Sequence, residues 1–304
     1  MASAREMRLR IRSVKSIAQV TSALETVSAA KVRRAIAAVN ATRPYAEKSW
    51  KLLVHLARQP GHTSLHPLLA GRSEVKKILV VLISGDRGLA GAFNANIVKD
   101  TLDHFRNFPA QVSYIAVGRK GRDMLLRRRR EVIAEFSDIP IAPSFASLSA
   151  VGHLVVDEYL QGRVDEVYLA YTDFHSMVKQ DTVIRKLVPL DVQYADDRVV
   201  AYNVTHHKTT SVFDFEPDDS QILSGIIARF TELQVYQAIL TSQASEQAAR
   251  MVSMRNATDN ARELISSLQM DYNKARQQAI TNDMLDITGG AEAMAAMTKT
   301  KETA

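Results

Sequence analysis

A run of glycines follows a short apolar stretch, and this segment holds the residue types most typical of a chemical site. Residues 78–94 read ILVVLISGDRGLAGAFN, with Gly85, Gly88 and Gly91 three residues apart. A buried strand that leads through a glycine-rich turn into a helix commonly holds a phosphate. Here no Lys-Ser/Thr follows the last glycine, and the spacing is not G-x-G-x-x-G. We therefore interpret the segment as a tight turn that binds no nucleotide cofactor.

Other candidates for catalysis are equally sparse. The chain has no cysteine, which excludes disulfides, thiolate metal sites and thiol catalysis. His175 and the pair His206–His207 lack a second histidine or carboxylate at metal-ligand spacing. Asp218–Asp219 are typical of a helix start rather than of an acid/base pair. The sequence predicts no catalytic residue, no metal site and no cofactor.

Glycine and proline divide the chain into three parts. Residues 1–43 contain neither, and residues 218–288 contain only Gly225. Between Gly61 and Pro217 both types recur, as in a turn-rich domain. We expect an N-terminal helix within 1–60, an α/β domain within 72–205 and a C-terminal helix within 215–304.

The C-terminal part follows a heptad pattern. From Leu223, alternating steps of three and four residues meet apolar side chains at fourteen of seventeen positions. The positions are Leu223, Ile226, Phe230, Leu233, Gln237, Leu240, Ala244, Gln247, Met251, Met254, Thr258, Ala261, Ile265, Leu268, Tyr272, Ala275 and Ala279. Some 70 helical residues would be roughly 105 Å long, which no compact domain can enclose.

The N-terminal part carries a matching apolar stripe. Its positions are Met7, Ile11, Val14 and Ala18, followed by Ile17, Val20, Leu24 and Val27 as the stripe drifts. We expect this helix to end near Arg43, because Pro44 restricts the preceding residue, and to resume through Trp50 to Leu56. The two terminal helices should pair as an antiparallel coiled coil.

The middle part reads as α/β. Short apolar strands are predicted at 77–83, 112–117 and 167–171, and helices at 92–105, 121–136 and 149–161. This alternation predicts a parallel, Rossmann-like sheet. The four arginines at 127–130 should close a helix. The expected fold is thus an antiparallel coiled coil of the N- and C-terminal helices with an inserted Rossmann-like α/β domain.

Charge is concentrated at the N-terminus. Residues 1–60 hold 12 Lys and Arg against 3 Asp and Glu, whereas residues 219–304 hold 8 against 10. A basic end can bind nucleic acid, but only Tyr45 and Trp50 are available there for base stacking. A solvated or partner-facing helix is the better interpretation. No secretory signal and no apolar run of about 20 residues is visible.

Several segments together resemble the gamma subunit of the rotary ATP synthase. They include REMRLRIRSVKSIAQVTSALETVSAAKVRRA near the N-terminus, SGDRGLAGAFN, VYLAYTDFHSMVKQDTVIRKLVPL, FDFEPDDSQIL, ASEQAARMVSMRNATDNA and NKARQQAITNDMLDITGGAEAM. They occur in the family's order and span nearly the whole chain. One departure is Asp283, where the family's I-T-x-E signature has the longer acid.

The resemblance implies a non-catalytic central rotor stalk. In that family the coiled coil turns inside a hexamer of alpha and beta subunits, which carry the nucleotide sites, and couples proton transport to ATP synthesis. The expected partners are the alpha and beta subunits, the epsilon subunit and the membrane c-ring, with no nucleic acid. The expected location is peripheral, on the cytoplasmic face of the bacterial cell membrane, through the rotor ring.

The resemblance also implies partner-contact residues. They are Leu24, Arg87, Phe215, Glu216, Glu246, Arg250, Arg276, Gln277, Thr281 and Asp283. Arg276, Gln277 and Thr281 would meet a loop of a beta subunit, and Phe215 and Glu216 would face the membrane ring. The alternatives are a coiled-coil seam position for Leu24, a helix-entry turn around Pro217 and solvated helix residues for the charged group.

Two other classes of function remain open from the sequence. One is a nucleotide-dependent enzyme that uses the α/β domain, and binding of ATP by the isolated chain would favour it. The other is a basic coiled-coil adaptor for nucleic acid, which would bind DNA with a steep salt dependence. Neither accounts for the C-terminal motifs.

Overall fold

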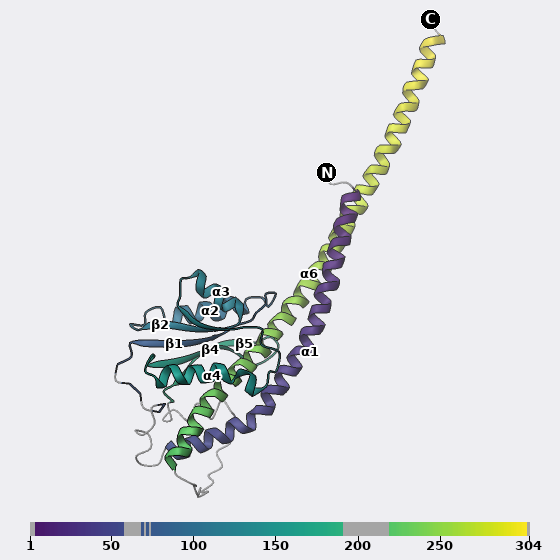
Figure 1. The fold of residues 1–304 in the computed structure, drawn as a ribbon. Coiled ribbons are helices and arrows are strands. Elements are labelled where there is room, and N and C mark those ends of the chain that lie inside the picture. The colour runs from purple at the N-terminus through teal and green to yellow at the C-terminus, as the bar shows by residue number, and fades with distance from the viewer. Residues whose placement is uncertain (1–3, 58–67, 70, 73, 191–218, 303–304) are drawn as a thin grey trace. The chain divides into compact units, whose positions relative to one another are not determined.

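The computed structural model describes residues 4–57, 68–69, 71–72, 74–190 and 219–302, and Figure 1 shows its helices and strands. In chain order they are α1 (Ala4–Ala57), β1 (Lys77–Ile83), α2 (Phe93–His104), β2 (Gln111–Val117), α3 (Arg119–Arg127), β3 (Val132–Phe136), α4 (Phe145–Leu160), β4 (Glu166–Phe174), β5 (Gln180–Val188) and α6 (Asp219–Glu302). The chain divides into two compact units, residues 26–253 and residues 1–25 with 254–304. The expected division into 1–60, 72–205 and 215–304 stays a prediction, because its boundaries fall largely outside the described residues.

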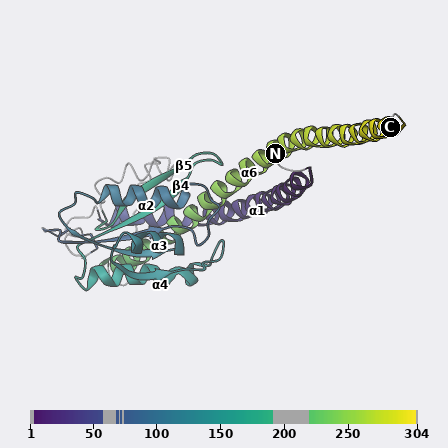
Figure 2. The same ribbon diagram turned by 90° about the horizontal axis from the view of Figure 1, so that it is seen from above.

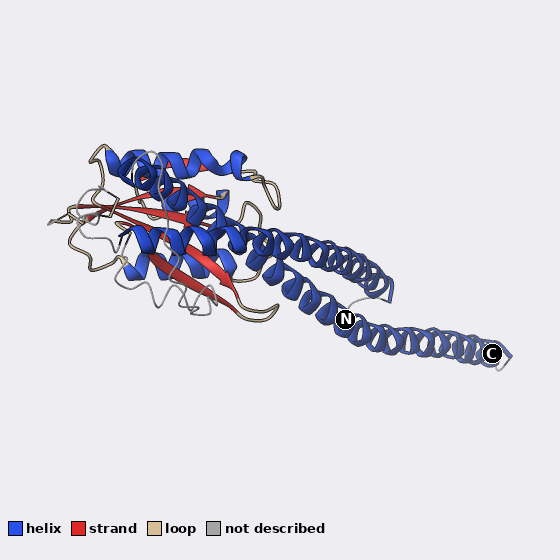
Figure 3. Ribbon diagram, turned by 90° about the horizontal axis from the view of Figure 1, so that it is seen from below, coloured by secondary structure: helices blue, strands red, loops and turns tan. Residues whose placement is uncertain are grey.

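The larger unit contains a five-stranded sheet in the order β3-β2-β1-β4-β5. The first four strands are parallel and β5 pairs antiparallel with β4. Helices cover both faces (Figure 3), and α2 and α4 lie on opposite sides of the strands (Figure 2). Residues 78–83 of β1 are buried, as expected for a strand covered on both faces. The predicted Rossmann-like sheet is confirmed.

Each face of the sheet has its own hydrophobic core. One core joins the sheet to α2 and α3, through residues such as Ile97 and Leu125. The other joins it to α4 and to the first part of α6, through residues such as Val155, Phe230 and Leu240. The C-terminal helix is therefore part of the α/β domain's core as well as a separate long helix.

The predicted helix over 121–136 is wrong in its second half. α3 ends at Arg127, and β3 follows at the sheet edge. The arginine run makes the turn between them: the N–H groups of Arg128 and Arg130 both donate to the carbonyl of Leu125, at 3.0 Å. The arginines do close a helix, as predicted. The strand was missed because only its alternate residues are half-buried. In a short edge strand this alternation is a weak sequence signal.

The predicted break near Arg43 is also wrong, because α1 continues through Pro44. A proline inside a helix removes one backbone donor, so the carbonyl of Asn40 loses its usual partner. Asn40 is exposed, which lets water compensate, and the hydroxyl of Thr42 donates to the carbonyl of Val39 at 2.9 Å. The proline is therefore tolerated without ending the helix.

The heptad pattern of α6 is confirmed over most of its length. From Ile226 to Ala275 every predicted seam position is buried or half-buried, and Ala279 is exposed. In the smaller unit α1 and α6 run antiparallel, because Thr21 hydrogen-bonds Thr258 at 2.7 Å and Arg255 donates to Glu25 at 3.0 Å. The predicted antiparallel pairing of the terminal helices is therefore observed there.

The apolar stripe of α1 does not drift as expected. Ile17, Val20 and Val27 are half or more exposed, whereas Leu24 is half-buried. Nine buried or half-buried positions keep strict heptad spacing instead. They are Met7, Ile11, Val14, Ala18, Thr21, Glu25, Ser28, Val32 and Ala35. Polar side chains occupy the middle of this heptad row. A search for apolar residues alone therefore departed from the correct heptad positions there.

Replacing Gly118 by Ala should destabilise the protein strongly. Gly118 has φ +99°, and a Cβ atom there would lie 2.3 Å from the carbonyl oxygen of Ser84. We expect a loss of about 2 kcal/mol or more in the free energy of unfolding, measured by urea denaturation. Gly88→Ala is the control, because a Cβ atom there meets nothing within 4 Å. Equal stability of the two variants would contradict the strain at Gly118.

Candidate functional site

The glycine-rich loop, residues 84–91, lies where α/β proteins usually bind ligands. It follows β1, whose neighbours in the sheet are β2 and β4. The chain leaves β1 toward β2 and β3 and later returns to β4 on the other side of β1, so the strand order reverses at this point. Ligands of open α/β sheets bind outside the carboxyl ends of the strands at such a reversal. Whether the loop can hold a nucleotide therefore depends on which residues occupy this position.

The helix α6 occupies that position. A Cβ atom on Gly85 would lie 2.6 Å from Oε1 of Glu246, so the glycine leaves room for this carboxylate. Arg250 donates to the same oxygen at 2.6 Å and to the carbonyl of Gly88 at 3.2 Å. The two side chains are only 14% and 12% exposed. We call this contact between Glu246, Arg250 and residues 85–88 the latch.

Two further contacts hold α6 against the carboxyl edge of the sheet. Ser245 donates to the carbonyl of Thr172 in β4 at 3.1 Å. Gln243 donates to the carbonyl of Pro140 at 2.9 Å and accepts from the N–H of Ala142 at 3.2 Å. The space left at the ends of β1 and β2 is about 40 Å³. That volume holds about one water molecule, whereas cofactor pockets are typically 300–1,000 Å³.

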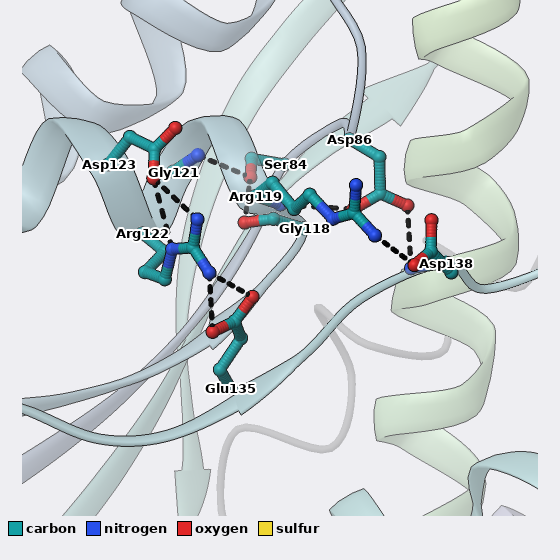
Figure 4. Close-up of polar contacts among 9 residues, drawn as sticks. All are labelled: Ser84, Asp86, Gly118, Arg119, Gly121, Arg122, Asp123, Glu135 and Asp138. Atoms are coloured by element: carbon teal, nitrogen blue, oxygen red, sulfur yellow. Dashed lines mark hydrogen bonds and ion pairs between the residues drawn. The ribbon is translucent and has the colours of Figure 1, made fainter.

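The polar side chains of the loop hold the strand ends together. Figure 4 shows Asp86 accepting from the backbone N–H groups of Arg119 and Asp138, each at 3.0 Å. Ser84 accepts from the N–H of Gly121 at 2.9 Å and donates to the carbonyl of Val117 at 3.1 Å. The two residues thus connect the segments that follow β1, β2 and β3. Their hydrogen bonds are internal to the domain.

Ion pairs surround these contacts. Arg122 donates to both carboxylate oxygens of Glu135, at 2.6 and 2.7 Å, and to Asp123 at 2.7 Å (Figure 4). The hydrogen bond from Arg122 lowers the pKa of Asp123, so this carboxylate stays ionised. Arg119 also forms an ion pair with Asp138. These charges are neutralised within the domain, which is typical of a structural network.

The predicted contact residues lie in three environments. Glu246 and Arg250 form the latch, and the exposed Arg87 lies in the loop that the latch holds. Leu24 is half-buried in α1. Arg276, Gln277, Thr281 and Asp283 are all exposed on α6, and Phe215 and Glu216 lie outside the described residues. The assignment of these residues to partner contacts stays a prediction.

Asn94 is a residue of the site to which sequence reasoning gave no role. Its side chain is buried, accepts from the N–H of Gly85 at 2.8 Å and donates to the carbonyl of Arg87 at 3.4 Å. It therefore fixes the loop from the first turn of α2. The available signal was its position at the start of the helix that follows the third glycine.

The far end of α6 is exposed on every side. All residues from Arg276 to Glu292 are exposed, including Ile280, Met284, Leu285 and Ile287, which are 52–72% exposed. Large apolar side chains exposed together on a helix usually mark a surface that a partner covers. We call residues 276–292 the tip.

A family described as ATP synthase matches residues 3–294 of this chain. A gamma chain of ATP synthase from Dehalococcoides mccartyi is 41% identical over 97% of this chain and all of the relative. The chain belongs to the ATP synthase gamma-chain family. A gamma chain from Roseiflexus castenholzii is 39% identical over 98% of this chain and all of that protein.

Solved structures resemble this gamma-family chain as well. The central stalk and c-ring structure of the Tetrahymena thermophila mitochondrial ATP synthase includes a chain that is 25% identical. Its TM-score is 0.58, and the match covers 78% of this chain and 99% of that one. A chain from the Euglena gracilis enzyme, 21% identical with a TM-score of 0.68, shares the fold over 97% of this chain and 96% of its own. No helix among the described residues is long and apolar enough to span a membrane.

Replacing Arg250 by Ala should destabilise the free gamma-family chain. The change leaves Glu246 buried without its charge partner, so we expect a loss of about 1–3 kcal/mol in the free energy of unfolding, measured by urea denaturation. Arg262→Ala is the matched control on the same helix. Arg262 is 67% exposed and pairs with Asp259, so its loss should cost at most about 0.5 kcal/mol. Unchanged stability of Arg250→Ala would contradict the latch and favour a residue that acts only on partners.

Proposed function

We propose that this chain is the central rotor stalk of a proton-driven ATP synthase. In this role it turns inside the hexamer of alpha and beta subunits and couples proton translocation to ATP synthesis at their catalytic sites. The observation that carries the proposal is the exposed apolar tip, in a chain related over its whole length to ATP synthase gamma chains. Related proteins alone give the family, whereas the tip indicates where the chain meets a partner.

The tip suits a helix that turns inside a ring of subunits. A helix that packs on a single neighbour typically carries an apolar stripe about 100° wide, with polar residues on its other faces. In the tip, Ile280, Met284, Leu285 and Ile287 lie at steps of four, one and two residues, so they share one broad side of the helix. At 100° per residue these four side chains span about 160°, slightly less than half of the circumference but wider than such a stripe. This broad, exposed apolar side supports a helix that partner subunits surround.

The chain itself acts without a catalytic site in this proposal. The latch and the remaining 40 Å³ of space support that role, because the position where a nucleotide would bind is filled by α6. The nucleotide sites would then belong to the alpha and beta subunits. The α/β domain keeps the architecture of a nucleotide-binding fold but serves as a domain fixed to the long helix α6.

The remaining partners follow from the same role. The chain would join the epsilon subunit and the membrane c-ring at its lower end, with Phe215 and Glu216 facing the ring. It would lie on the cytoplasmic face of the bacterial membrane as a peripheral subunit, attached through the rotor ring. Leu24 and Arg87 would add contacts to the catalytic subunits, and Arg276, Gln277, Thr281 and Asp283 would contact them at the tip.

Assembly with alpha and beta subunits, followed by substitution of Arg276, tests this proposal. The chain should co-purify with tagged alpha and beta subunits as one complex. Arg276→Ala should still assemble but have lower ATPase activity, because one charge-assisted hydrogen bond to a beta-subunit loop is lost. We expect a reduction of roughly tenfold, equivalent to about 1.4 kcal/mol.

Arg262→Ala serves as the control here too, because Arg262 is exposed and pairs with Asp259 in its own helix. Its complex should retain normal activity. Failure of the chain to co-purify with alpha and beta subunits would refute the proposed function. Normal activity of Arg276→Ala in an assembled complex would refute only the tip contact.

A further inference from the structure

A second site of a different kind lies on the face of the sheet that α1 and α6 cover. It is a groove of about 610 Å³ within the larger unit, bounded by α1, by β4 and β5 and by α6. This volume is in the range of small-molecule sites, and the groove is more than ten times larger than the space beside the latch. The family relationship assigns no role to it.

The groove has an apolar interior. Leu169 and Tyr171 of β4 form its floor and are 2% and 9% exposed. Ile36 and Val39 line it from α1, and Ala238 and Ala244 line it from α6. The two alanines are buried, and their short side chains leave space where leucines elsewhere on α6 fill the core. The hollow therefore follows from residue size on α6.

A cation without a partner borders this apolar interior. Arg185 of β5 stands opposite Leu169 in the β4–β5 ladder and is half-buried. Its guanidinium has no hydrogen-bond or ion-pair partner in the part of the chain that the structure describes. A partly desolvated charge of this kind is costly unless an opposite charge approaches it. Arg43 contributes a second guanidinium to the lining, from α1.

The acidic side chain in the groove does not pair with Arg185. Asp173 lies 3.8 Å from Nε2 of His175, which is also 3.3 Å from Asp181. Both distances involve the histidine, and Asp173 makes no ion pair with Arg185 at 4 Å or less. Amide donors are present as well, from Asn40, Gln234 and Gln237. The lining thus offers the guanidinium of Arg185 and several amides beside an apolar floor.

We propose that this groove binds a small organic anion with an apolar body, such as an aryl carboxylate or sulfonate. The anionic group pairs with Arg185, and the apolar body packs on Leu169 and Tyr171. Bidentate pairing with a guanidinium suits planar carboxylates and sulfonates. A molecule bound there touches α1, the sheet and α6 together, so its binding stabilises the folded chain. The proposal does not depend on the function proposed above.

Calorimetric titration of the full chain with naphthalene-2-sulfonate tests the site. We expect saturable binding of one molecule per chain. Arg185→Gln should weaken the affinity about tenfold, the contribution of one charge-assisted hydrogen bond, and Arg185→Lys should recover part of it. Thr241→Leu, which enlarges a half-buried side chain of the lining, should weaken binding by narrowing the groove. Arg128→Gln, an exposed arginine in the turn after α3, is the matched control and should bind like the unchanged chain.

Three results would overturn the proposal. They are the absence of saturable binding, equal affinities of Arg185→Gln and Arg128→Gln, and unchanged binding by Thr241→Leu in a variant whose circular dichroism shows the native fold.

The same titration on the assembled complex with alpha and beta subunits separates a small molecule from a protein occupant. Retained binding supports the small-molecule site, whereas loss of binding on assembly would contradict it and indicate that another subunit covers the groove.

Discussion

The carboxylate of Glu246 lies in the space that any side chain at residue 85 would need, and much of the structure depends on this contact. Gly85 lets α6 approach the carboxyl edge of the sheet, where Arg250 then binds both Glu246 and the carbonyl of Gly88. Because the pair is nearly buried, each charge needs the other, and removal of either would leave the remaining one desolvated. The loop and the helix therefore fold as one unit.

This contact changes the meaning of the α/β domain. A parallel sheet with a glycine-rich turn after its first strand has the geometry of a phosphate site, yet the same turn here accepts a helix of its own chain. Asp86, Ser84 and Asn94, which might otherwise face a ligand, hold backbone groups of the strand ends. In the proposed rotor, this arrangement fixes the α/β domain to α6.

The sequence predicted most of the architecture because its strongest patterns are long or deeply buried. The heptads of α6 and the apolar run of β1 allow few other structures. The errors arose where tertiary packing outweighed local signals. Pro44 does not interrupt α1, β3 is a short edge strand, and Thr21, Glu25 and Ser28 keep the seam of α1 where apolar residues were sought.

The contact residues were harder to predict for a physical reason. Charged helix residues such as Glu246, Arg250 and Arg276 look alike in a sequence, whether they are buried against their own chain or exposed. The structure separates them, because the first two are held in the latch and the third lies on the exposed tip. What remains to be predicted is which of the exposed residues a partner touches, since one chain does not contain the other side of an interface.

The central claim is that the α/β domain and the long helix turn together as one rotor. The chain contains no cysteine, so a single cysteine at the exposed Arg128 can carry a visible probe on the α/β domain. With the alpha and beta hexamer fixed to a surface, addition of ATP should make this probe rotate in one direction as ATP is hydrolysed. A probe that stays still during normal ATP hydrolysis would contradict the account.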